Sequence, residues 1–264
     1  MKERLDKLLM KRGLVSSRER AKALILEGRV LVNAAPVDKA GAMVDEGAEI
    51  VLRGGDIPYA SRGGLKLEGA LDHFRIRLDG LVVMDVGAST GGFTDCMLQR
   101  GAAKVYAVDV GYGQLSWKLR NDPRVVVLER QNIRYLTADL VPEGVDLVTI
   151  DVSFISLLKV VPKVTEFLKR GGGVLALVKP QFEVGRTEVD KGGVIRSEEK
   201  RTSVLRRLTA EFERMGLDIH GVFESPLRGQ KGNVEYFVYM TRQAPAGVHG
   251  AERSAAETAG PGET

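Results

Sequence analysis

The segment from Leu81 to Phe93, LVVMDVGASTGGF, constrains the fold of this chain more than any other part of the sequence. Its first six residues are almost entirely apolar, as in a buried strand, and its last seven include three glycines that lead into a helical pattern. A strand that turns through glycines into a helix is typical of open α/β sheets, which bind nucleotide ligands at such turns. The segment therefore predicts a parallel sheet with a ligand site at the carboxyl edge of its strands.

The glycine spacing narrows the choice of ligand. Ser89 occupies the place of the second glycine of a dinucleotide-binding loop, where a side chain keeps the backbone away from a pyrophosphate. The chain also lacks the Gly-Lys-Ser/Thr sequence of phosphate-binding loops. A ligand that carries adenosine without phosphate groups fits better, and S-adenosylmethionine is the common one.

Two aspartates support this choice. Asp85, near the end of the strand, is placed to meet the methionine ammonium group directly or through water, and Asp109, 24 residues later, can accept both ribose hydroxyls. Tyr112 and Trp117 follow, either as an apolar wall for adenine or as core residues. The predicted cofactor-binding residues are Asp85, Gly87, Ala88, Ser89, Gly91, Gly92, Phe93, Asp109 and Val110. A structural turn beside a solvated aspartate is the alternative interpretation.

From Ser61 onward, helical and apolar-strand patterns alternate, which predicts an α/β domain with a mostly parallel, seven-stranded sheet. The expected strands cover 81–86, 104–110, 125–128, 146–150, 173–178, 218–224 and 234–241, and the main helices cover 64–74 and 197–215. The loop at 225–233 is too short for a helical crossover, so the last two strands should form an antiparallel hairpin.

The first 57 residues differ from the rest in pattern and charge. Leucines at 5, 8 and 9 recur at helical spacing, and a second helix is expected from Ser16 to Gly28, with Ser16 and Glu19 as a capping box. Residues 1–29 hold nine Lys or Arg against four Asp or Glu, whereas the net charge of the whole chain is +4. A basic N-terminal segment in a chain whose charges otherwise nearly balance suits a polyanionic partner, although a solvated helix face would carry the same charge.

These patterns divide the chain. We expect a small α+β domain at 1–57, a linker at 58–61, where Pro58 resists helix, and the α/β domain at 62–243. Residues 244–264 have almost no large apolar side chains, so we expect a disordered tail there.

Four polar residues are expected at the ligand edge of the sheet. Asp151 and Lys179 each follow a parallel strand, Glu235 opens the last strand, and Lys66 lies on the helix before the first strand. Because residues 173–178 are apolar, an unpaired ammonium on Lys179 would be energetically costly. A lysine that lies close to other cations also loses its proton more easily. Lys179 would then serve as a general base toward a sugar hydroxyl. A plain salt bridge between Lys179 and Asp151 is the alternative interpretation.

Composition argues against other kinds of site. The single cysteine, Cys96, excludes an intrachain disulfide and fits a reducing cytoplasm, and the three histidines lie far apart, so no metal is expected. No apolar stretch approaches the ~20 residues that span a bilayer, and residues 1–13 lack the apolar core of a secretory signal. We expect a cytoplasmic protein, and the sequence leaves its oligomeric state open.

Several motifs resemble known families. The pattern of residues 4–33, with RLD at its start and VLVN at its end, resembles the alpha-L RNA-binding domain named after a small-subunit ribosomal protein. The motifs SRGGLKLEGAL, DVGASTGGF, IDVSFISL, LVKPQFE and GNVEYF resemble those of FtsJ-like ribose methyltransferases. In this order and over residues 1–242, the two parts together resemble the TlyA family, often labelled hemolysin. One departure is Val32-Asn33-Ala34, where the RNA-binding domain usually has Val-Asn-Gly, so we expect a changed local turn.

The resemblance implies a Rossmann-like S-adenosylmethionine-dependent methyltransferase fold and 2′-O-methylation of ribose, in cytidine of ribosomal RNA. The family's Lys-Asp-Lys-Glu tetrad falls on Lys66, Asp151, Lys179 and Glu235, with a lysine as general base. It implies that basic residues position RNA phosphates, and the candidates are Arg4, Arg18, Arg20, Lys22, Arg62, Arg228 and Lys231. The charged stretch 182–196 is a candidate lid that orders on substrate.

Other classes of function remain as alternatives at this point. The chain could be an RNA-binding or ribosome-assembly factor on a non-catalytic methyltransferase scaffold. A pore-forming hemolysin lacks a membrane-spanning or strongly amphipathic candidate segment, and Ser89 disfavours a nicotinamide dehydrogenase.

Overall fold

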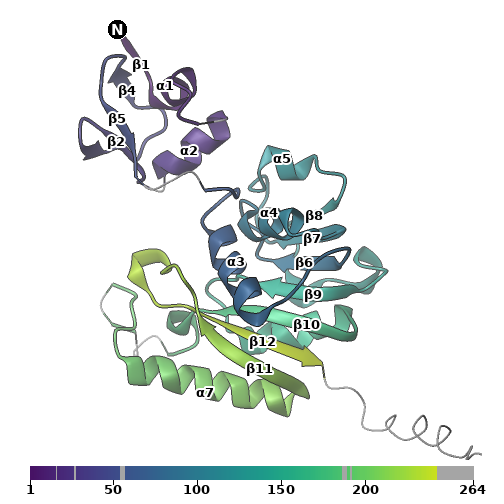
Figure 1. Ribbon diagram of the computed structural model, residues 1–264. Coiled ribbons are helices and arrows are strands. Elements are labelled where there is room, and N and C mark those ends of the chain that lie inside the picture. Colours follow the sequence, from purple (N-terminus) through teal and green to yellow (C-terminus); the bar gives the residue numbers. More distant parts are fainter. Residues whose placement is uncertain (16, 27, 54–56, 186–188, 191, 243–264) are drawn as a thin grey trace, which may run out of the picture.

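A computed structural model describes residues 1–15, 17–26, 28–53, 57–185, 189–190 and 192–242, so the expected disordered tail lies outside the described residues. The first part, residues 1–53, is here called the N-terminal unit, and residues 57–242 are called the sheet unit. The two lie side by side, with the N-terminal unit at the top left of Figure 1. Domain boundaries at 57, 61 and 243 remain predictions, although Ile57 already packs in the core of the sheet unit.

The N-terminal unit contains two short helices and short antiparallel strand pairs. Its elements are β1 (Lys2–Arg4), α1 (Leu5–Lys11), α2 (Arg18–Leu26), β2 (Val30–Val32), β3 (Ala35–Pro36), β4 (Met43–Asp45) and β5 (Ile50–Leu52). Its own apolar core consists of Leu5, Leu8, Leu9, Ala21, Leu24, Ile25, Val30 and Val44. The leucine spacing in the sequence thus marks the buried face of α1.

The start of α2 differs from the predicted one. The helix begins at Arg18, and the Ser17 hydroxyl accepts a hydrogen bond from the backbone N–H of Arg20 at 3.1 Å. This is the bond of an N-cap serine, which satisfies a helix N–H that has no partner within the helix. Ser16, the expected cap, lies outside the described residues.

The turn between β2 and β3 keeps a regular two-residue geometry. Asn33 and Ala34 have φ angles of 50° and 65°, and Val32 pairs with Ala35 across the turn. Positive φ at both central residues defines the turn that ordinarily carries Asn-Gly. The expectation of a changed turn was therefore wrong: Ala34 adopts the left-handed conformation, which costs an L-residue roughly 1–2 kcal/mol relative to right-handed backbone.

The sheet unit is built on seven strands in the order β11-β12-β10-β9-β6-β7-β8. They are β6 (Val82–Val86), β7 (Lys104–Asp109), β8 (Val125–Glu129), β9 (Val145–Ile150), β10 (Leu168–Val178), β11 (Leu217–Glu224) and β12 (Tyr236–Arg242). Strands β6 to β10 pair in parallel, whereas β12 runs antiparallel to both of its neighbours, β10 and β11. The predicted parallel sheet with an antiparallel C-terminal hairpin is confirmed.

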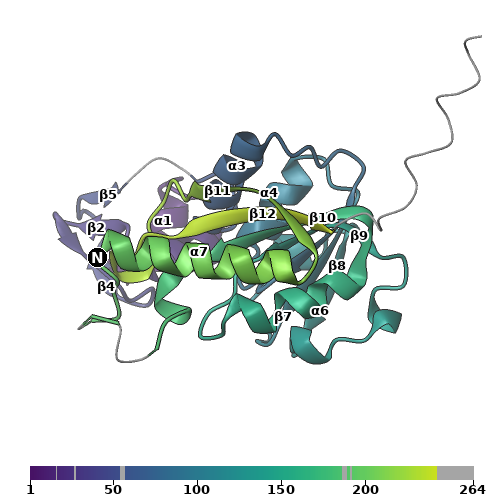
Figure 2. The ribbon, with the colours of Figure 1, turned by 90° about the horizontal axis from the view of Figure 1, so that it is seen from below.

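Helices cover both faces of this sheet, as Figures 1 and 2 show. On one face α3 (Gly63–Phe74) and α4 (Gly92–Gln99) pack with the short α5 (Trp117–Arg120). The other face is covered by α6 (Val161–Val164) and α7 (Glu198–Arg214). Alternate strand residues enter the two cores, for example Val83 on the α3 side and Met84 on the α7 side. Burial on both faces explains why the strands read as continuous apolar runs.

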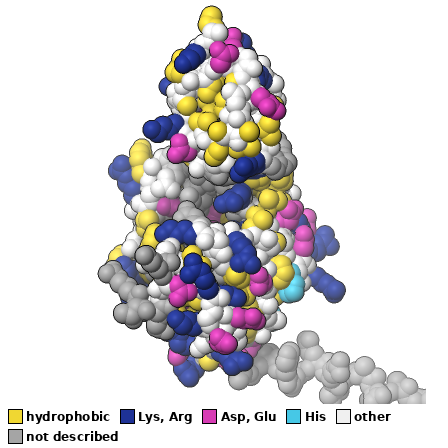
Figure 3. Space-filling model, turned by 90° about the vertical axis from the view of Figure 1, so that its left-hand side faces the viewer, with side chains coloured by type: hydrophobic (Ala, Val, Ile, Leu, Met, Phe, Trp, Pro, Cys, Tyr) yellow, Lys and Arg dark blue, Asp and Glu magenta, His cyan; other side chains and the backbone are white. Residues whose placement is uncertain are grey.

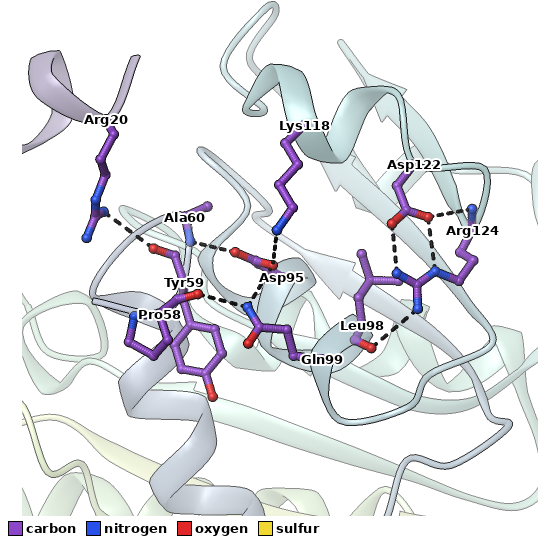
Figure 4. A network of polar contacts seen from close by, with 10 residues as sticks. All are labelled: Arg20, Pro58, Tyr59, Ala60, Asp95, Leu98, Gln99, Lys118, Asp122 and Arg124. Carbon is purple, nitrogen blue, oxygen red and sulfur yellow. Dashed lines mark hydrogen bonds and ion pairs between the residues drawn. The ribbon is translucent and has the colours of Figure 1, made fainter. Parts of the chain in front are cut away.

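The linker between the units is held from both sides (Figure 4). From α2, the Arg20 guanidinium donates to the carbonyls of Ile57 and Tyr59 at 3.1 and 3.4 Å. From α4, the Gln99 amide donates to the carbonyl of Pro58 at 2.8 Å, and the Asp95 carboxylate accepts the N–H of Ala60 at 2.8 Å. The four consecutive residues 57–60 are thus bonded to a helix of one unit or the other.

Candidate active site

The four polar residues expected at the ligand edge come together as two ion pairs. Lys66 Nζ lies 2.6 Å from Glu235 Oε2, and Lys179 Nζ lies 2.6 Å from Asp151 Oδ1. Lys66 and Glu235 are only 13% and 3% exposed, and the other pair is mostly buried as well. In such surroundings each charge needs its partner, because water screens it little.

The sheet register sets these positions. Asp151 directly follows β9, and its N–H donates to the carbonyl of Val86 in the neighbouring strand at 2.9 Å. Lys179 directly follows β10, whose last residue, Val178, pairs with Tyr236 at the start of β12. Glu235 is therefore brought to the carboxyl edge of the parallel strands because β12 runs the opposite way. Lys66 reaches the same edge from the first turn of α3.

Two cavities meet at this edge. The larger, about 530 Å³, has an apolar wall of Val108, Ile133, Ile155 and Val160 beside the polar Asp109. The smaller, about 260 Å³, is lined by polar and basic side chains that include Ser61, Arg62, Lys66 and Arg228. Gly87, Ser89 and Asp151 line both cavities. Two different ligands could therefore meet beside Asp151.

The glycine loop fixes the shape of this junction. Gly87 has a φ of +89°, and a Cβ atom there would lie 2.5 Å from the carbonyl oxygen of Asp151. The loop continues with Ser89, whose N–H donates to Asp109 Oδ2 at 2.7 Å, while the N–H of Gly111 donates to Asp109 Oδ1 at 2.6 Å. Backbone donors thus hold the Asp109 carboxylate in place, and each of its oxygens retains a second acceptor position for a ligand hydroxyl.

The remaining predicted loop residues fall into two groups. Ala88, Gly92 and Phe93 line the smaller cavity, and Val110 lines the larger one. Gly91 is the N-cap of α4, and a Cβ atom there would overlap the side chain of Leu119. Gly91 therefore allows α5 to pack closely on the loop.

Asp85 lies away from both cavities. It is fully buried, its Oδ2 accepts a hydrogen bond from Thr94 Oγ1 at 2.6 Å, and it is absent from both cavity walls. Burial raises the pKa of Asp85 to about 7, with a further contribution from the nearby Asp151 charge. The Asp85 carboxylate is therefore not placed to contact a ligand in the larger cavity.

This burial has a consequence for stability. The ordinary Asp pKa lies near 4, so between pH 4 and 7 the unfolded chain has lost the proton that the folded chain keeps. Raising the pH from 5 to 8 should therefore lower the free energy of unfolding by about 2–3 kcal/mol through this group alone. Asp85→Asn, which cannot titrate, should lose that part of the pH dependence. Urea unfolding of both proteins at pH 5 and pH 8 measures the difference, and parallel losses in the two proteins would contradict the assignment to Asp85.

Part of the cavity wall was missed by sequence reasoning. Gln131, Asn132 and Ile133 follow β8 and line the larger cavity, so the position after a parallel strand was the available signal. The two aromatic candidates do neither of the things expected of them. Tyr112 and Trp117 are 68% and 73% exposed, so they neither pack in the core nor line the cavity.

The basic residues implied by the resemblance have different surroundings. Arg4 and Arg18 both pair with the buried Asp6, at 3.0 and 2.9 Å, and the hydrogen bond from Arg4 holds the pKa of Asp6 well below its usual range. Arg20 bonds the linker carbonyls, whereas Lys22 and Lys231 are exposed. Basic side chains occur on both units of the face shown in Figure 3. Arg62 and Arg228 are the two that line the smaller cavity.

The expected lid is bonded to the sheet unit where it is described. The Asn233 side chain donates to the carbonyl of Gly193 at 2.9 Å and accepts the N–H of Ile195 at 3.2 Å. Arg201 also donates to the carbonyls of Ile195 and Arg196, and Ile195 is buried. Residues 186–188 and 191 of the expected lid lie outside the described residues.

Among the residues that the structure describes, no group of three or more His, Cys, Asp or Glu side chains is placed to hold a metal ion. None of the helices in the same part of the chain is long and apolar enough to cross a membrane.

Comparison with known proteins agrees with this architecture. Residues 59–242 match the model of the FtsJ-like methyltransferase family, and residues 3–50 match that of the S4 domain. A Bacillus subtilis protein named "Putative rRNA methyltransferase YqxC" is 47% identical over 90% of this chain and 85% of its own length. A Mycobacterium tuberculosis protein named "16S/23S rRNA (cytidine-2'-O)-methyltransferase TlyA" is 46% identical over 91% of this chain and 90% of its own length. A solved structure, "Putative hemolysin from Streptococcus thermophilus", has a TM-score of 0.73 at 45% identity and covers 91% of this chain and 88% of that one.

Proposed function

The chain belongs to the FtsJ-like methyltransferase family, and on that basis we propose that it transfers the methyl group of S-adenosylmethionine to the 2′-hydroxyl of a cytidine ribose in ribosomal RNA. The observation that carries the proposal is the pair of lysine–carboxylate contacts at the junction of the two cavities. The names of the curated relatives support the substrate class.

The larger cavity suits the cofactor. Asp109 has free acceptor positions for the two ribose hydroxyls, and Val108, Ile133 and Val160 offer an apolar surface for adenine. Gly87 and Ser89 lie where this cavity meets the smaller one, which suits the methionine part. When bound, S-adenosylmethionine supplies an electrophilic methyl group on a sulfonium.

The tetrad residues suit deprotonation of a ribose hydroxyl. In its neutral form, the Lys179 amine accepts the proton of the 2′-hydroxyl, so that the oxygen can attack the methyl carbon. Asp151 orients Lys179 and stabilises the ammonium that forms. Lys66, held by Glu235, carries a positive charge on the wall of the smaller cavity, where it stabilises the developing negative charge of the ribose oxygen.

The surface around the smaller cavity suits RNA. Arg62 and Arg228 line it and are placed to contact the phosphates beside a target nucleotide. Phe154, three residues after Asp151, is 88% exposed, as expected of a side chain that stacks on an unpaired base. In the N-terminal unit, Arg4 and Arg18 extend the set of phosphate contacts while Asp6 keeps them oriented. A ribosomal substrate places the protein in the cytoplasm.

The test is transfer of a labelled methyl group from S-adenosylmethionine to purified small subunits, large subunits and naked ribosomal RNA. We expect incorporation into at least one of these substrates, located at a cytidine 2′-oxygen by nuclease digestion and mass spectrometry. No incorporation, together with RNA binding and no cofactor binding by calorimetry, would favour the alternative of a non-catalytic ribosome-assembly factor. Release of dye from lipid vesicles by the purified protein would instead favour a hemolysin.

A further inference from the structure

Lys179 has a second polar partner besides Asp151. Its Nζ donates a hydrogen bond to Ser153 Oγ at 3.0 Å. Ser153 lies in the turn after β9, two residues beyond Asp151, and lines the larger cavity. Ser153 is not one of the four tetrad residues, and the proposed function gives it no role.

The turn is built so that Ser153 faces Lys179. Glu183, which is buried, accepts hydrogen bonds from Ser156 Oγ at 2.6 Å and from the N–H of Leu157 at 2.8 Å. Glu183 lies four residues after Lys179 and so joins the segment after β10 to the turn after β9. The rings of Phe154 and Phe182, one from each segment, lie 4.7 Å apart. These contacts fix the two segments against each other, and with them the position of Ser153 beside Lys179.

The contact between Ser153 and Lys179 affects how a neutral lysine amine is oriented. A neutral lysine has two N–H bonds and one lone pair in a tetrahedral arrangement, and the lone pair has to point at the proton that it accepts. Ser153 accepts one N–H of Lys179, and Asp151 Oδ1 lies 2.6 Å from Nζ as its ion-pair partner, so the two contacts occupy two positions around Nζ and leave one for the lone pair. With Asp151 alone, the amine could rotate and present an N–H to the substrate.

We propose that Ser153 is a positioning residue that directs the lone pair of Lys179 toward the substrate hydroxyl. The inference rests on the proposed function, because it assigns Ser153 a part in the same proton transfer. The proton moves from the ribose oxygen to Lys179 Nζ as the oxygen–methyl bond forms and the sulfur–methyl bond breaks. Ser153 keeps its own proton throughout.

The experiment compares Ser153→Val with Ser153→Thr, which have nearly the same shape and differ in the hydroxyl. In single-turnover methyl transfer at saturating cofactor and RNA, the valine variant should be about 10-fold slower, because misorientation of a catalytic group costs rate rather than binding. The threonine variant should retain most of the wild-type rate, and the two variants, which have nearly the same shape, should bind cofactor and RNA with equal affinity.

The pH dependence of the methyl-transfer rate distinguishes a loss of lysine orientation from a general distortion of the site. An acceptor on Nζ favours the ammonium form, so its loss should let the neutral amine form at lower pH. The valine variant should therefore combine a lower plateau rate with a half-maximal rate at lower pH. A distorted site would lower the rate without this shift. Equal rates and equal pH profiles for the two variants would overturn the proposal.

An assay that needs no methyl transfer tests the role of Ser153 independently of the proposed function. Acylation of lysines by an acetylating reagent, followed by peptide mass spectrometry across a pH series, reports when Lys179 becomes neutral. Lys66, which pairs with Glu235, serves as the reference within the same sample. If the wild-type protein transfers no methyl group, the proposed function fails, and this comparison alone decides whether Ser153 acts on Lys179. If the pH dependence of Lys179 acylation is identical in the valine and threonine variants, the proposed action of Ser153 on Lys179 is wrong.

Discussion

Lys179→Ala should reduce methyl transfer by roughly 10³-fold or more while cofactor affinity stays within about twofold of the wild type. The alanine removes the amine that accepts the ribose proton, and general-base catalysis of this kind is typically worth 10²- to 10⁴-fold. Cofactor binding should survive because Lys179 is not part of the wall of the larger cavity, to which we assign the cofactor, and its Nζ lies beside Asp151 at the junction of the two cavities. Single-turnover transfer to ribosomal subunits and calorimetry with S-adenosylhomocysteine measure the two quantities.

Two further variants make this prediction specific. Lys179→Arg keeps a positive charge beside Asp151 but stays protonated, so it should be nearly as inactive as alanine. Lys159→Ala, at an exposed lysine in the short helix before α6, should behave as wild type. Substantial activity in the arginine variant would show that a charge, rather than a base, is what the reaction needs at this position.

Gly87→Ala should strongly reduce methyl transfer by weakening the cofactor site. The new methyl group would lie 2.5 Å from the carbonyl oxygen of Asp151, and a residue with a side chain is strained at a φ of +89°. The loop and the Asp151 segment have to move apart, which changes the junction of the two cavities. We expect cofactor affinity to fall by at least about 30-fold, equivalent to the roughly 2 kcal/mol of strain that the bound geometry would have to absorb.

Gly80 offers a matched control. It has a comparable φ of +74°, but a Cβ atom there meets nothing within 4 Å. Gly80→Ala thus carries the backbone strain without the steric clash, and it should bind cofactor as the wild type does. Thermal unfolding of both variants would show whether each remains folded. Normal cofactor affinity in Gly87→Ala would mean that the loop does not shape the cofactor site.

The sequence predicted the sheet well because its signals are local. Each parallel strand is an apolar run bounded by turns, and five parallel strands with helices on both faces leave little choice of architecture. The edge that collects Asp151 and Lys179 then follows from strand direction alone. Glu235 was placed at that edge for the same reason, since β12 is antiparallel.

What the sequence could not supply are contacts between distant side chains. Nothing local to Arg20 indicates that it bonds the linker at Ile57, and its basic character suggested a phosphate contact instead. Asp85 has the spacing of a ligand-binding residue, yet the Thr94 hydroxyl holds it in the interior. The Ser153 contact likewise depends on how two turns from different strands are fixed together.

The position of β12 governs when the sheet can be completed during synthesis of the chain. β12 lies between β10 and β11 and is hydrogen-bonded to both, so β11 cannot join the sheet until the segment from Tyr236 to Arg242 has left the ribosome. Such long-range pairing is slow compared with local structure and comes late in folding. Glu235, the partner of Lys66, arrives with that strand. A nascent chain that has completed the glycine loop and all five parallel strands therefore still lacks Glu235, the last of the four residues proposed for the active site, and could not yet carry out the proposed reaction.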